Sequence, residues 1–102
     1  MVLMEMSIVP IGVGESVSQY VAQCVNVVDR SGLKYELHAM GTIVEGELPE
    51  VLRLLEECIE EVAKNANRVS CTAKIDYRRG AVGGMRSRVA SVEQKLGRPA
   101  HH

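Results

Sequence analysis

Carboxylates are concentrated in the stretch Lys34–Glu47, which reads KYELHAMGTIVEGE. The alternation of apolar and polar residues predicts two strands here, joined by a two-residue turn at Met40-Gly41, where glycine can adopt the positive φ of a tight turn. This register places Glu36 opposite Glu45 on one face. Like charges directly opposed across two strands destabilise the pair, so the sequence predicts a compensating group nearby.

Other polar residues are expected on the same face. Glu5 lies in the predicted first strand and Lys74 in the predicted last strand, and the nearby hydroxyls of Ser7 and Thr72 can form hydrogen bonds. Lys74 can pair with Glu5, but one lysine cannot neutralise three carboxylates. A cleft of this kind, closed by a partner subunit, suits a small organic cation with polar edges, because exclusion of water strengthens its attraction to carboxylates.

The elements that would position these residues follow from hydrophobic periodicity. Strands are predicted over residues 2–9, on both sides of the turn at 40–41, and over residues 68–77, with Pro10 ending the first. Ser16 and Gln19 match a capping box, which predicts a first helix that ends before Gly32. A second helix is predicted to begin at Pro49, and a short last helix to run from Met85 to Leu96.

The predicted order is strand, helix, strand, strand, helix, strand, followed by an additional C-terminal helix. This order predicts an α+β, ferredoxin-like βαββαβ sandwich, in which two helices cover one face of an antiparallel four-stranded sheet. The other face stays uncovered, and a half-apolar face in a domain of this size is usually covered by another subunit. If the second strand forms an edge, however, Glu36 and His38 face solvent.

The core is expected to be aliphatic, because aromatic residues make up only 3% of the chain. Each of the two longer helices carries one apolar stripe. The stripe predicted for the first helix comprises Val17, Tyr20, Val21, Cys24 and Val28. The stripe predicted for the second comprises Leu52, Leu55, Ile59, Val62 and Ala66, and Leu48 offers this helix only a weak N-terminal cap.

Composition narrows the class of protein. The 102 residues allow one domain, expected over residues 1–98, with residues 99–102 as a tail in which His101 and His102 resemble the start of a purification tag. A net charge of −1 gives no field that would recruit nucleic acid or an acidic membrane. Three dispersed cysteines, with no basic signal-peptide segment, favour a reducing cytoplasm and inert core thiols.

Charge is distributed unevenly along the chain. Residues 45–61 hold seven acids and one base, whereas residues 78–98 hold six bases and one acid. Two interpretations are open: the two segments form solvated helix faces, or they form complementary patches that meet between subunits.

The sequence gives little support for catalysis. Gly12-Val13-Gly14 lacks the later residues of a phosphate-binding loop, and dispersed thiols with one usable histidine, His38, provide no nucleophile–base pair. The face expected to be open carries no aromatic residue on which a nucleic-acid base could stack. We therefore expect no catalytic residues, no metal, no cofactor and no nucleic-acid partner.

Several short stretches, taken in order, resemble the small thiamine-binding protein family over about residues 2–96. They are Glu5 through Pro10, Lys34-Tyr35-Glu36, Met40-Gly41-Thr42, Glu45-Gly46-Glu47, Lys74-Ile75-Asp76, Arg78-Arg79 and Ser91-Val92-Glu93. One departure is Gly80, which stands where many relatives have an aspartate.

The resemblance implies a ferredoxin-like fold whose sheets pack into dimers and often tetramers, with thiamine or its pyrimidine part bound near a subunit interface. It implies a binding protein and not a catalyst. The ligand-binding residues predicted on this basis are Glu5, Ser7, Met40 (as an apolar wall), Thr42, Glu45, Lys74 and Asp76. The alternative is a structural or regulatory homo-oligomerisation module without a small-molecule ligand.

Overall fold

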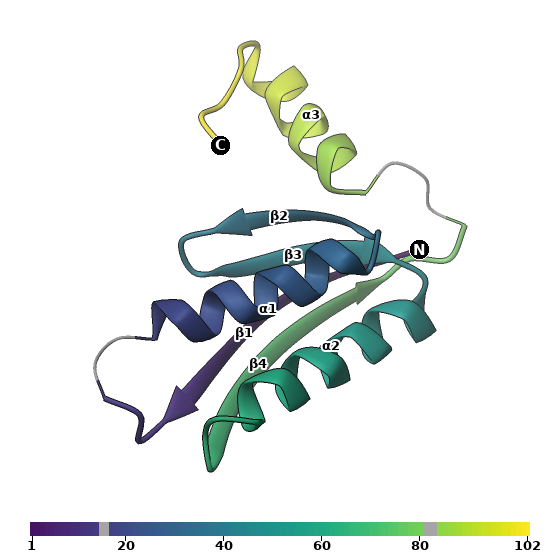
Figure 1. Cartoon of the computed structure of the whole chain (residues 1–102). Helices are drawn as coiled ribbons and strands as arrows, with labels where there is room; N and C mark the ends of the chain where they lie inside the picture. Colours follow the sequence, from purple (N-terminus) through teal and green to yellow (C-terminus); the bar gives the residue numbers. More distant parts are fainter. Residues whose placement is uncertain (15–16, 81–83) are drawn as a thin grey trace.

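The computed structural model of the chain describes residues 1–14, 17–80 and 84–102 (Figure 1). Its elements are β1 (Val2–Ile11), α1 (Ser18–Arg30), β2 (Lys34–His38), β3 (Gly41–Gly46), α2 (Leu48–Ala63), β4 (Arg68–Tyr77) and α3 (Met85–Leu96). The cap predicted at Ser16 lies outside the described residues. The predicted order of elements is confirmed.

The four strands form one antiparallel sheet in the order β2-β3-β1-β4. Helices α1 and α2 lie side by side across one face of this sheet, as Figure 1 shows. Neither helix covers the opposite face, which we call the open face. The predicted ferredoxin-like α+β sandwich with an additional C-terminal helix is therefore confirmed.

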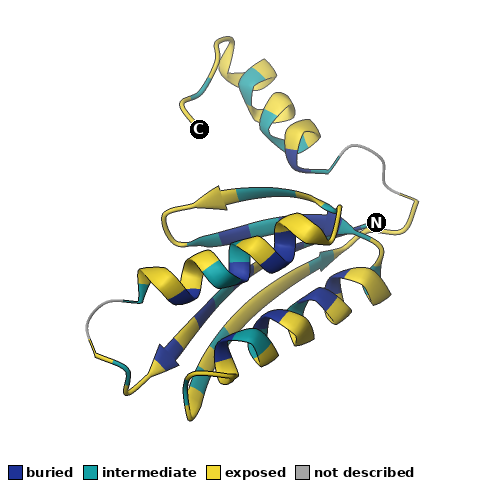
Figure 2. Ribbon diagram, in the orientation of Figure 1, coloured by how far each residue is buried: buried dark blue, intermediate teal, exposed yellow. Residues whose placement is uncertain are grey.

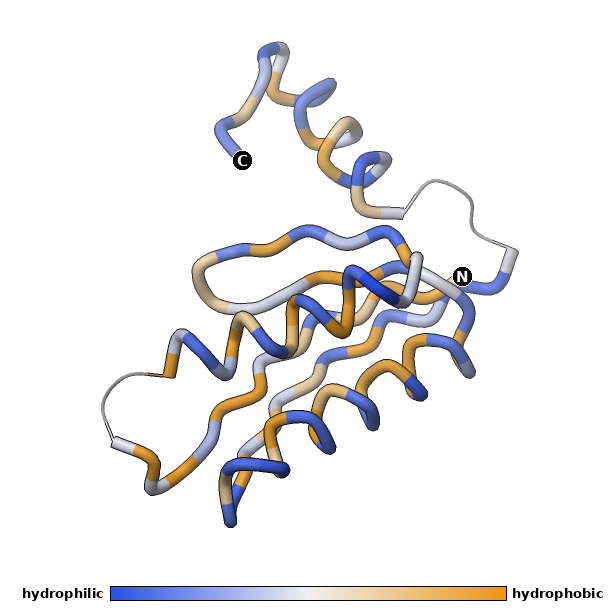
Figure 3. The backbone as a smooth tube through the Cα atoms, viewed as in Figure 1, coloured by the Kyte–Doolittle hydropathy of each residue, from blue (hydrophilic) through white to orange (hydrophobic). Residues whose placement is uncertain are grey.

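The core lies between the sheet and helices α1 and α2. Alternate side chains of β1 point toward the helices and are buried, and Figures 2 and 3 show that the inner sides of the helices are buried and largely apolar. The buried helix residues are Tyr20, Cys24, Val27 and Val28 in α1 and Val51, Leu54, Cys58 and Val62 in α2. The core is aliphatic apart from Tyr20, as the composition predicts.

Both predicted helix stripes are wrong in part. Val21 and Leu52 are 38% and 45% exposed, whereas Val27 and Val51 are buried. The reason is that α1 and α2 contact each other as well as the sheet. This second contact turns the buried side of each helix toward its neighbour and leaves Val21 and Leu52 on the outer flanks of the pair.

Strand β1 continues through Pro10 to Ile11, where the sequence predicted its end. Met1 and Arg78 exchange backbone hydrogen bonds. Backbone hydrogen bonds alternate along an antiparallel strand. From that pair onward, the backbone N–H and C=O groups of the odd-numbered residues of β1 therefore point toward β4, and those of the even-numbered residues point toward β3. The pairing with β3 ends at Met6. A backbone N–H group at position 10 would point toward the β3 side, where no strand pairs with this part of β1. Proline has no N–H group, so its presence here costs no hydrogen bond of the sheet.

The turn between β2 and β3 consists of Ala39 and Met40, because His38 pairs with Gly41. The turn predicted at Met40-Gly41 is thus wrong by one residue. Gly41 lies inside β3 and does not have a positive φ. A Cβ atom at Gly41 would come within 2.8 Å of the Met6 carbonyl oxygen. This glycine is required for the close approach of β3 to β1, and not for the turn.

The shifted turn changes the pairing of charges in the hairpin. Lys34, and not Glu36, lies opposite Glu45, and Glu36 lies opposite Ile43. The predicted opposition of two carboxylates is therefore wrong, although both side chains do share the open face. Instead, the opposite charges of Lys34 and Glu45 lie across from each other, which favours the pairing of β2 with β3.

The ends of the long helices are well defined. Helix α2 begins at Leu48, so Glu47 is its N-cap, and the Glu50 carboxylate accepts a hydrogen bond of 3.0 Å from the backbone N–H of Glu47. The weak cap predicted at Leu48 is thus wrong, because a capping box forms one residue earlier. Past the end of α1, Gly32 has a φ of +78°, as predicted for the glycine that follows a helix.

Helix α3 projects from the rest of the chain (Figure 1). Met85 is its one buried residue, whereas Val92 and Leu96 are 59% and 47% exposed. The Cα radius of gyration is 15.0 Å, compared with about 13 Å for a compact domain of this length. Among the described residues, no helix combines the length and the apolar character needed to cross a membrane.

We expect Gly41→Ala to lower the free energy of unfolding by about 1–3 kcal/mol, because the added methyl group overpacks the contact with β1. Urea unfolding followed by circular dichroism measures this change. Met40→Ala is the control in the same hairpin. Its side chain is 87% exposed, so we expect a change within about 0.5 kcal/mol. A Gly41→Ala variant as stable as the native protein would contradict the proposed constraint.

Candidate ligand-binding site

The open face carries the acidic and basic residues that the sequence placed there. The strand register sets Glu5 opposite Lys74 and Ser7 opposite Thr72. Among the residues that the structure describes, however, the expected Glu5–Lys74 ion pair is not formed. Both side chains are exposed, and water solvates exposed charges well enough that such a pair contributes little.

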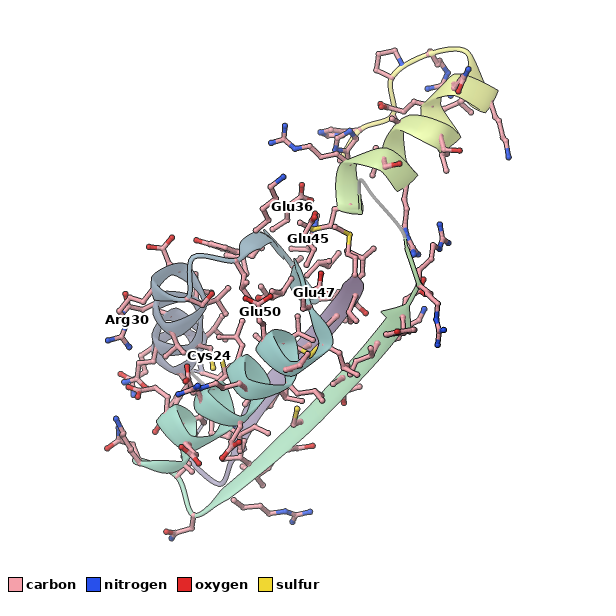
Figure 4. All side chains as sticks on the ribbon, turned by 90° about the vertical axis from the view of Figure 1, so that its right-hand side faces the viewer. Cys24, Arg30, Glu36, Glu45, Glu47 and Glu50 are labelled. Carbon is pink, nitrogen blue, oxygen red and sulfur yellow. The ribbon has the colours of Figure 1, made fainter. Side chains whose placement is uncertain are left out.

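Glu45 is the acidic residue of the open face that is most shielded from water, with 7% of its surface exposed. Its Oε1 atom accepts a hydrogen bond of 3.4 Å from the backbone N–H of Met85, the first residue of α3. A Cβ atom at Gly84 would lie 2.8 Å from Glu45 Oε2. Figure 4 shows Glu45 beside Glu36 below the start of α3. A carboxylate at a helix N-terminus is stabilising, so Glu45 anchors α3 to the sheet.

A second open-face acid also contacts α3. The Arg88 guanidinium donates a hydrogen bond to the Asp76 carboxylate within an ion pair. This contact holds the pKa of Asp76 below its ordinary value. Glu45 and Asp76 are therefore both engaged by a helix of their own chain.

A hollow of about 470 Å³ lies beside Glu45, between the sheet and the start of α3. Its charged residues are Lys34, Glu36, Glu45 and Arg86. Two basic and two acidic groups line the same space, so their charges offset one another. The hollow consequently lacks the strong preference for a cation that its carboxylates alone would give it.

A different cavity lies on the helix-covered face, between the start of α1 and the β2–β3 hairpin. We call it the hairpin slot, and its volume is about 120 Å³. Its walls include Ile8, Val17, Val21, Leu37, Met40 and Thr42. Leu37 and Met40 are 55% and 87% exposed, so the hairpin side of the slot faces solvent. Apolar walls with few polar groups are typical of small-molecule sites.

Thr42 is the buried polar residue of the hairpin slot. It pairs with Met6 and Leu37, which places its side chain on the helix-covered face, and 7% of its surface is exposed. Within residues 1–14, 17–80 and 84–102, no group forms a hydrogen bond with its hydroxyl. A hydroxyl can both donate and accept, so Thr42 is available to a polar atom of a ligand.

The residues predicted to bind a ligand do not form one site in one chain. Those that line the hairpin slot are Ser7, Met40 and Thr42, although the strand register places the side chain of Ser7 on the open face. Glu45 lines the hollow below α3, and the others, Glu5, Lys74 and Asp76, lie elsewhere on the open face. The side chains of Thr42 and Glu45 leave opposite faces of the sheet, so no ligand in a single chain contacts both.

The sequence analysis missed the contribution of α1 to the hairpin slot. Val17 and Val21 were assigned to the core stripe of this helix. In the structure both line the slot, together with Leu37 of β2. One feature of the sequence could have indicated this slot: an apolar residue at the flank of a helix stripe, next to an edge strand. Few neighbouring residues cover such a position, so its side chain stays partly exposed.

Two of the three cysteines are buried between α1 and α2, as predicted. The Sγ atom of Cys24 lies 3.8 Å from the Cys58 carbonyl oxygen, and the reverse contact is also 3.8 Å. The contact with Cys24 and burial raise the pKa of the Cys58 thiol, and burial raises the pKa of the half-buried Cys71. Among the described residues, no group of three or more His, Cys, Asp or Glu side chains is arranged to hold a metal ion.

The sheet order and the hairpin slot define a ferredoxin-like α+β domain with a small, mostly apolar cavity. Comparison with known proteins then gives its family. The family model described as "Thiamine-binding protein" matches residues 4–93, and the chain belongs to this family. It is similar to the UPF0045 protein MT1949 of Mycobacterium tuberculosis, with 41% identity over 99 residues that cover 96% of this chain and 97% of that protein.

Solved structures share the fold. The hypothetical protein MJ1052 of Methanocaldococcus jannaschii has a TM-score of 0.85 and 35% identity, covering 91% of this chain and 96% of that one. The Thermotoga maritima protein TM0486, described as a "putative thiamine biosynthesis/salvage protein", has a TM-score of 0.79, and the match covers 89% of this chain and 97% of that one. At 23% identity, this likeness concerns the fold alone.

The Asp76–Arg88 pair leads to a prediction about titration. A carboxyl whose pKa is lowered by folding stabilises the native state above its unfolded pKa, and this stability is lost as the pH falls through the folded value. We expect Asp76 to titrate below its ordinary range in the native protein and closer to that range in Arg88→Ala. Side-chain carboxyl chemical shifts measure both. Arg86→Ala, which removes a neighbouring charge outside the pair, is the control, and identical Asp76 titrations in all three proteins would rule out the contact.

Proposed function

We propose that this protein binds thiamine, or a related compound that carries its pyrimidine or thiazolium ring, and does not convert it. The observation that carries the proposal is the Thr42 hydroxyl, which lies in an apolar slot and has no hydrogen-bond partner among the described residues. Membership of the thiamine-binding family supports the ligand class. A substituted pyrimidine has the matching chemistry, because its faces are apolar and its ring nitrogens and amino group need hydrogen bonds.

The lining of the hairpin slot limits how the ligand is held. Its described walls are mostly apolar and hold no carboxylate, so they offer no counter-charge to a cationic ring. We therefore propose that the pyrimidine ring enters the slot between Val21 and Met40, and that the charged thiazolium ring stays at the mouth, where it keeps its contact with water.

The open-face carboxylates enter this proposal only through a second subunit. Glu5 and Glu45 are separated from a ligand in the hairpin slot of the same chain by the sheet itself. The open face is nevertheless suited to self-association, because Leu3, Val9 and Ile43 add apolar surface among its charged residues. We propose that the protein is a homo-oligomer in the cytoplasm whose open faces contribute to assembly.

Calorimetric titration with thiamine tests the ligand proposal. We expect Thr42→Val, which keeps the shape of the side chain and removes the hydroxyl, to weaken thiamine binding about 5- to 150-fold, the equivalent of about 1–3 kcal/mol for leaving a buried ligand atom without a partner. Thr72→Val on the open face is the matched control, because the same substitution there lies outside the slot. It should bind thiamine as the native protein does.

Two results would count against the proposal in different ways. If Thr72→Val weakens binding as much as Thr42→Val does, the ligand does not occupy the hairpin slot. If the assembled native protein binds neither thiamine nor its pyrimidine at millimolar concentration, the alternative of an oligomerisation module without a small ligand is favoured.

A further inference from the structure

Two cysteines from different helices face each other in the core. Cys24 lies in α1 (Figure 4) and Cys58 in α2, 34 residues apart in the chain. The Sγ atom of each lies 3.8 Å from the backbone carbonyl oxygen of the other. Because each sulfur reaches the backbone of the opposite residue, the two side chains point toward one another across the helix pair. A disulfide needs this arrangement, since its two residues must direct their Cβ atoms toward each other.

The third cysteine is not part of this pair. Cys71 lies in β4, opposite Ile8 of β1, and is half-buried. Among the described residues, the hydrogen-bond contacts of the thiols join Cys24 and Cys58, and none reaches Cys71. Burial also raises the pKa of the Cys71 thiol, which keeps it protonated and less reactive.

The two paired thiols differ in reactivity. The contact with the Cys58 thiol lowers the pKa of Cys24, whereas the contact with Cys24, together with burial, raises the pKa of Cys58. A thiolate is the nucleophilic form of cysteine, so Cys24 is the member of the pair that reacts first. Exposure agrees with this order, because 8% of the Cys24 surface is exposed and Cys58 is fully buried.

The hairpin slot connects Cys24 with solvent. Cys24 lines this slot, and the exposed Leu37 and Met40 line its hairpin side. Cys58 is not among the described residues that line it. A small oxidant that enters the slot therefore meets the Cys24 sulfur and reaches Cys58 only through it. Hydrogen peroxide, which is little larger than water, fits this space.

We propose that Cys24 and Cys58 are a reversible dithiol–disulfide site, in which Cys24 reacts with a hydroperoxide and Cys58 resolves the product. The site is separate from the Thr42 hydroxyl, and the disulfide forms in a chain without any ligand. In a reducing compartment such a disulfide is transient, as redox-sensing disulfides are.

The oxidation has two balanced steps. The Cys24 thiolate attacks one oxygen of hydrogen peroxide, the O–O bond breaks, and Cys24 becomes a sulfenic acid. The other oxygen leaves as hydroxide and becomes water with the proton that Cys24 released. The Cys58 sulfur then attacks the Cys24 sulfur, the S–O bond breaks, and a second water leaves with the Cys58 proton. The two electrons that the thiols lose reduce one peroxide, and a thiol reductant such as glutathione restores the pair by exchange.

Counting free thiols and mapping peptides tests the site directly. The reduced native chain has three thiols. We expect hydrogen peroxide to leave one of them free, at Cys71, because the other two form the disulfide. Trypsin cleaves after Arg30 and Arg53, between the paired cysteines, so mass spectrometry should find their two peptides joined. Cys71→Ala is the matched control, and it should lose both of its thiols at the rate of the native protein.

A second variant separates the two steps. In the Cys71→Ala background, Cys58→Ala removes the resolving thiol, so the reaction should stop at the Cys24 sulfenic acid, which dimedone traps. Circular dichroism checks that this variant is folded, and the peptide map of the native protein decides the matter without it. Native thiols that all survive peroxide would overturn the proposal. So would a disulfide that joins Cys71 to either of the other two.

Oxidation should also change stability. The disulfide would join α1 to α2 and close the segment of chain that contains the β2–β3 hairpin. Closing such a loop restricts the unfolded chain and stabilises the native state. The oxidised protein should therefore unfold at a higher urea concentration than the reduced protein. Peroxide treatment should give Cys58→Ala no such gain, and an equal gain in both proteins would contradict the disulfide.

One further result rests on the proposed function, because Cys24 lines the proposed ligand site. Thiamine at about ten times its Kd should slow the loss of thiols about tenfold, since only the unoccupied fraction of the protein admits peroxide. If the disulfide forms but thiamine does not slow it, the dithiol site is supported and the ligand lies outside the hairpin slot. If no disulfide forms in the absence of thiamine, the dithiol site is wrong whatever the ligand does.

Discussion

The structure depends on the close approach of β3 to β1 at Gly41. A Cβ atom there would lie 2.8 Å from the Met6 carbonyl oxygen, so the chain must place glycine at this point of the ladder. Because Gly41 is held inside β3, the turn falls on Ala39 and Met40 and the register of the whole hairpin is set. A one-residue slip would move every hairpin side chain to the opposite face. The same constraint keeps Thr42 on the helix-covered side.

That register places different functional groups on the two faces of the sheet. The helix-covered side receives Thr42, which together with the start of α1 forms an apolar slot, and no described residue forms a hydrogen bond with the Thr42 hydroxyl. The open side receives Glu45, which anchors α3 through the backbone of Met85. We propose that the slot receives a neutral aromatic ring, whereas the charges around Glu45 dock α3. A ligand with one neutral and one cationic ring would then place its neutral ring in the slot and its cationic ring in water.

The sequence predicted the fold well because strand alternation and element order depend on local pattern. Through family resemblance it also predicted Thr42 and Met40 as ligand-binding residues, and both line the hairpin slot. It could not predict the turn, since whether a glycine serves a positive φ or a close approach depends on a strand far away in sequence, as Gly41 and Met6 illustrate. It could not predict the role of Val21 either, because the rotation of a helix about its axis is set by the neighbouring helix. Nor did any local pattern indicate that α3 would engage Glu45.

We propose that thiamine occupies the hairpin slot and not the open face. Titration of the ¹⁵N-labelled protein with thiamine, followed through backbone amide chemical shifts, tests it most directly. We expect the largest shifts in residues 17–25 and 37–42, on both walls of the slot, and little change in the amides of residues 72–76. Shifts concentrated on residues 72–76 and around Glu5, with the walls of the slot unaffected, would contradict it.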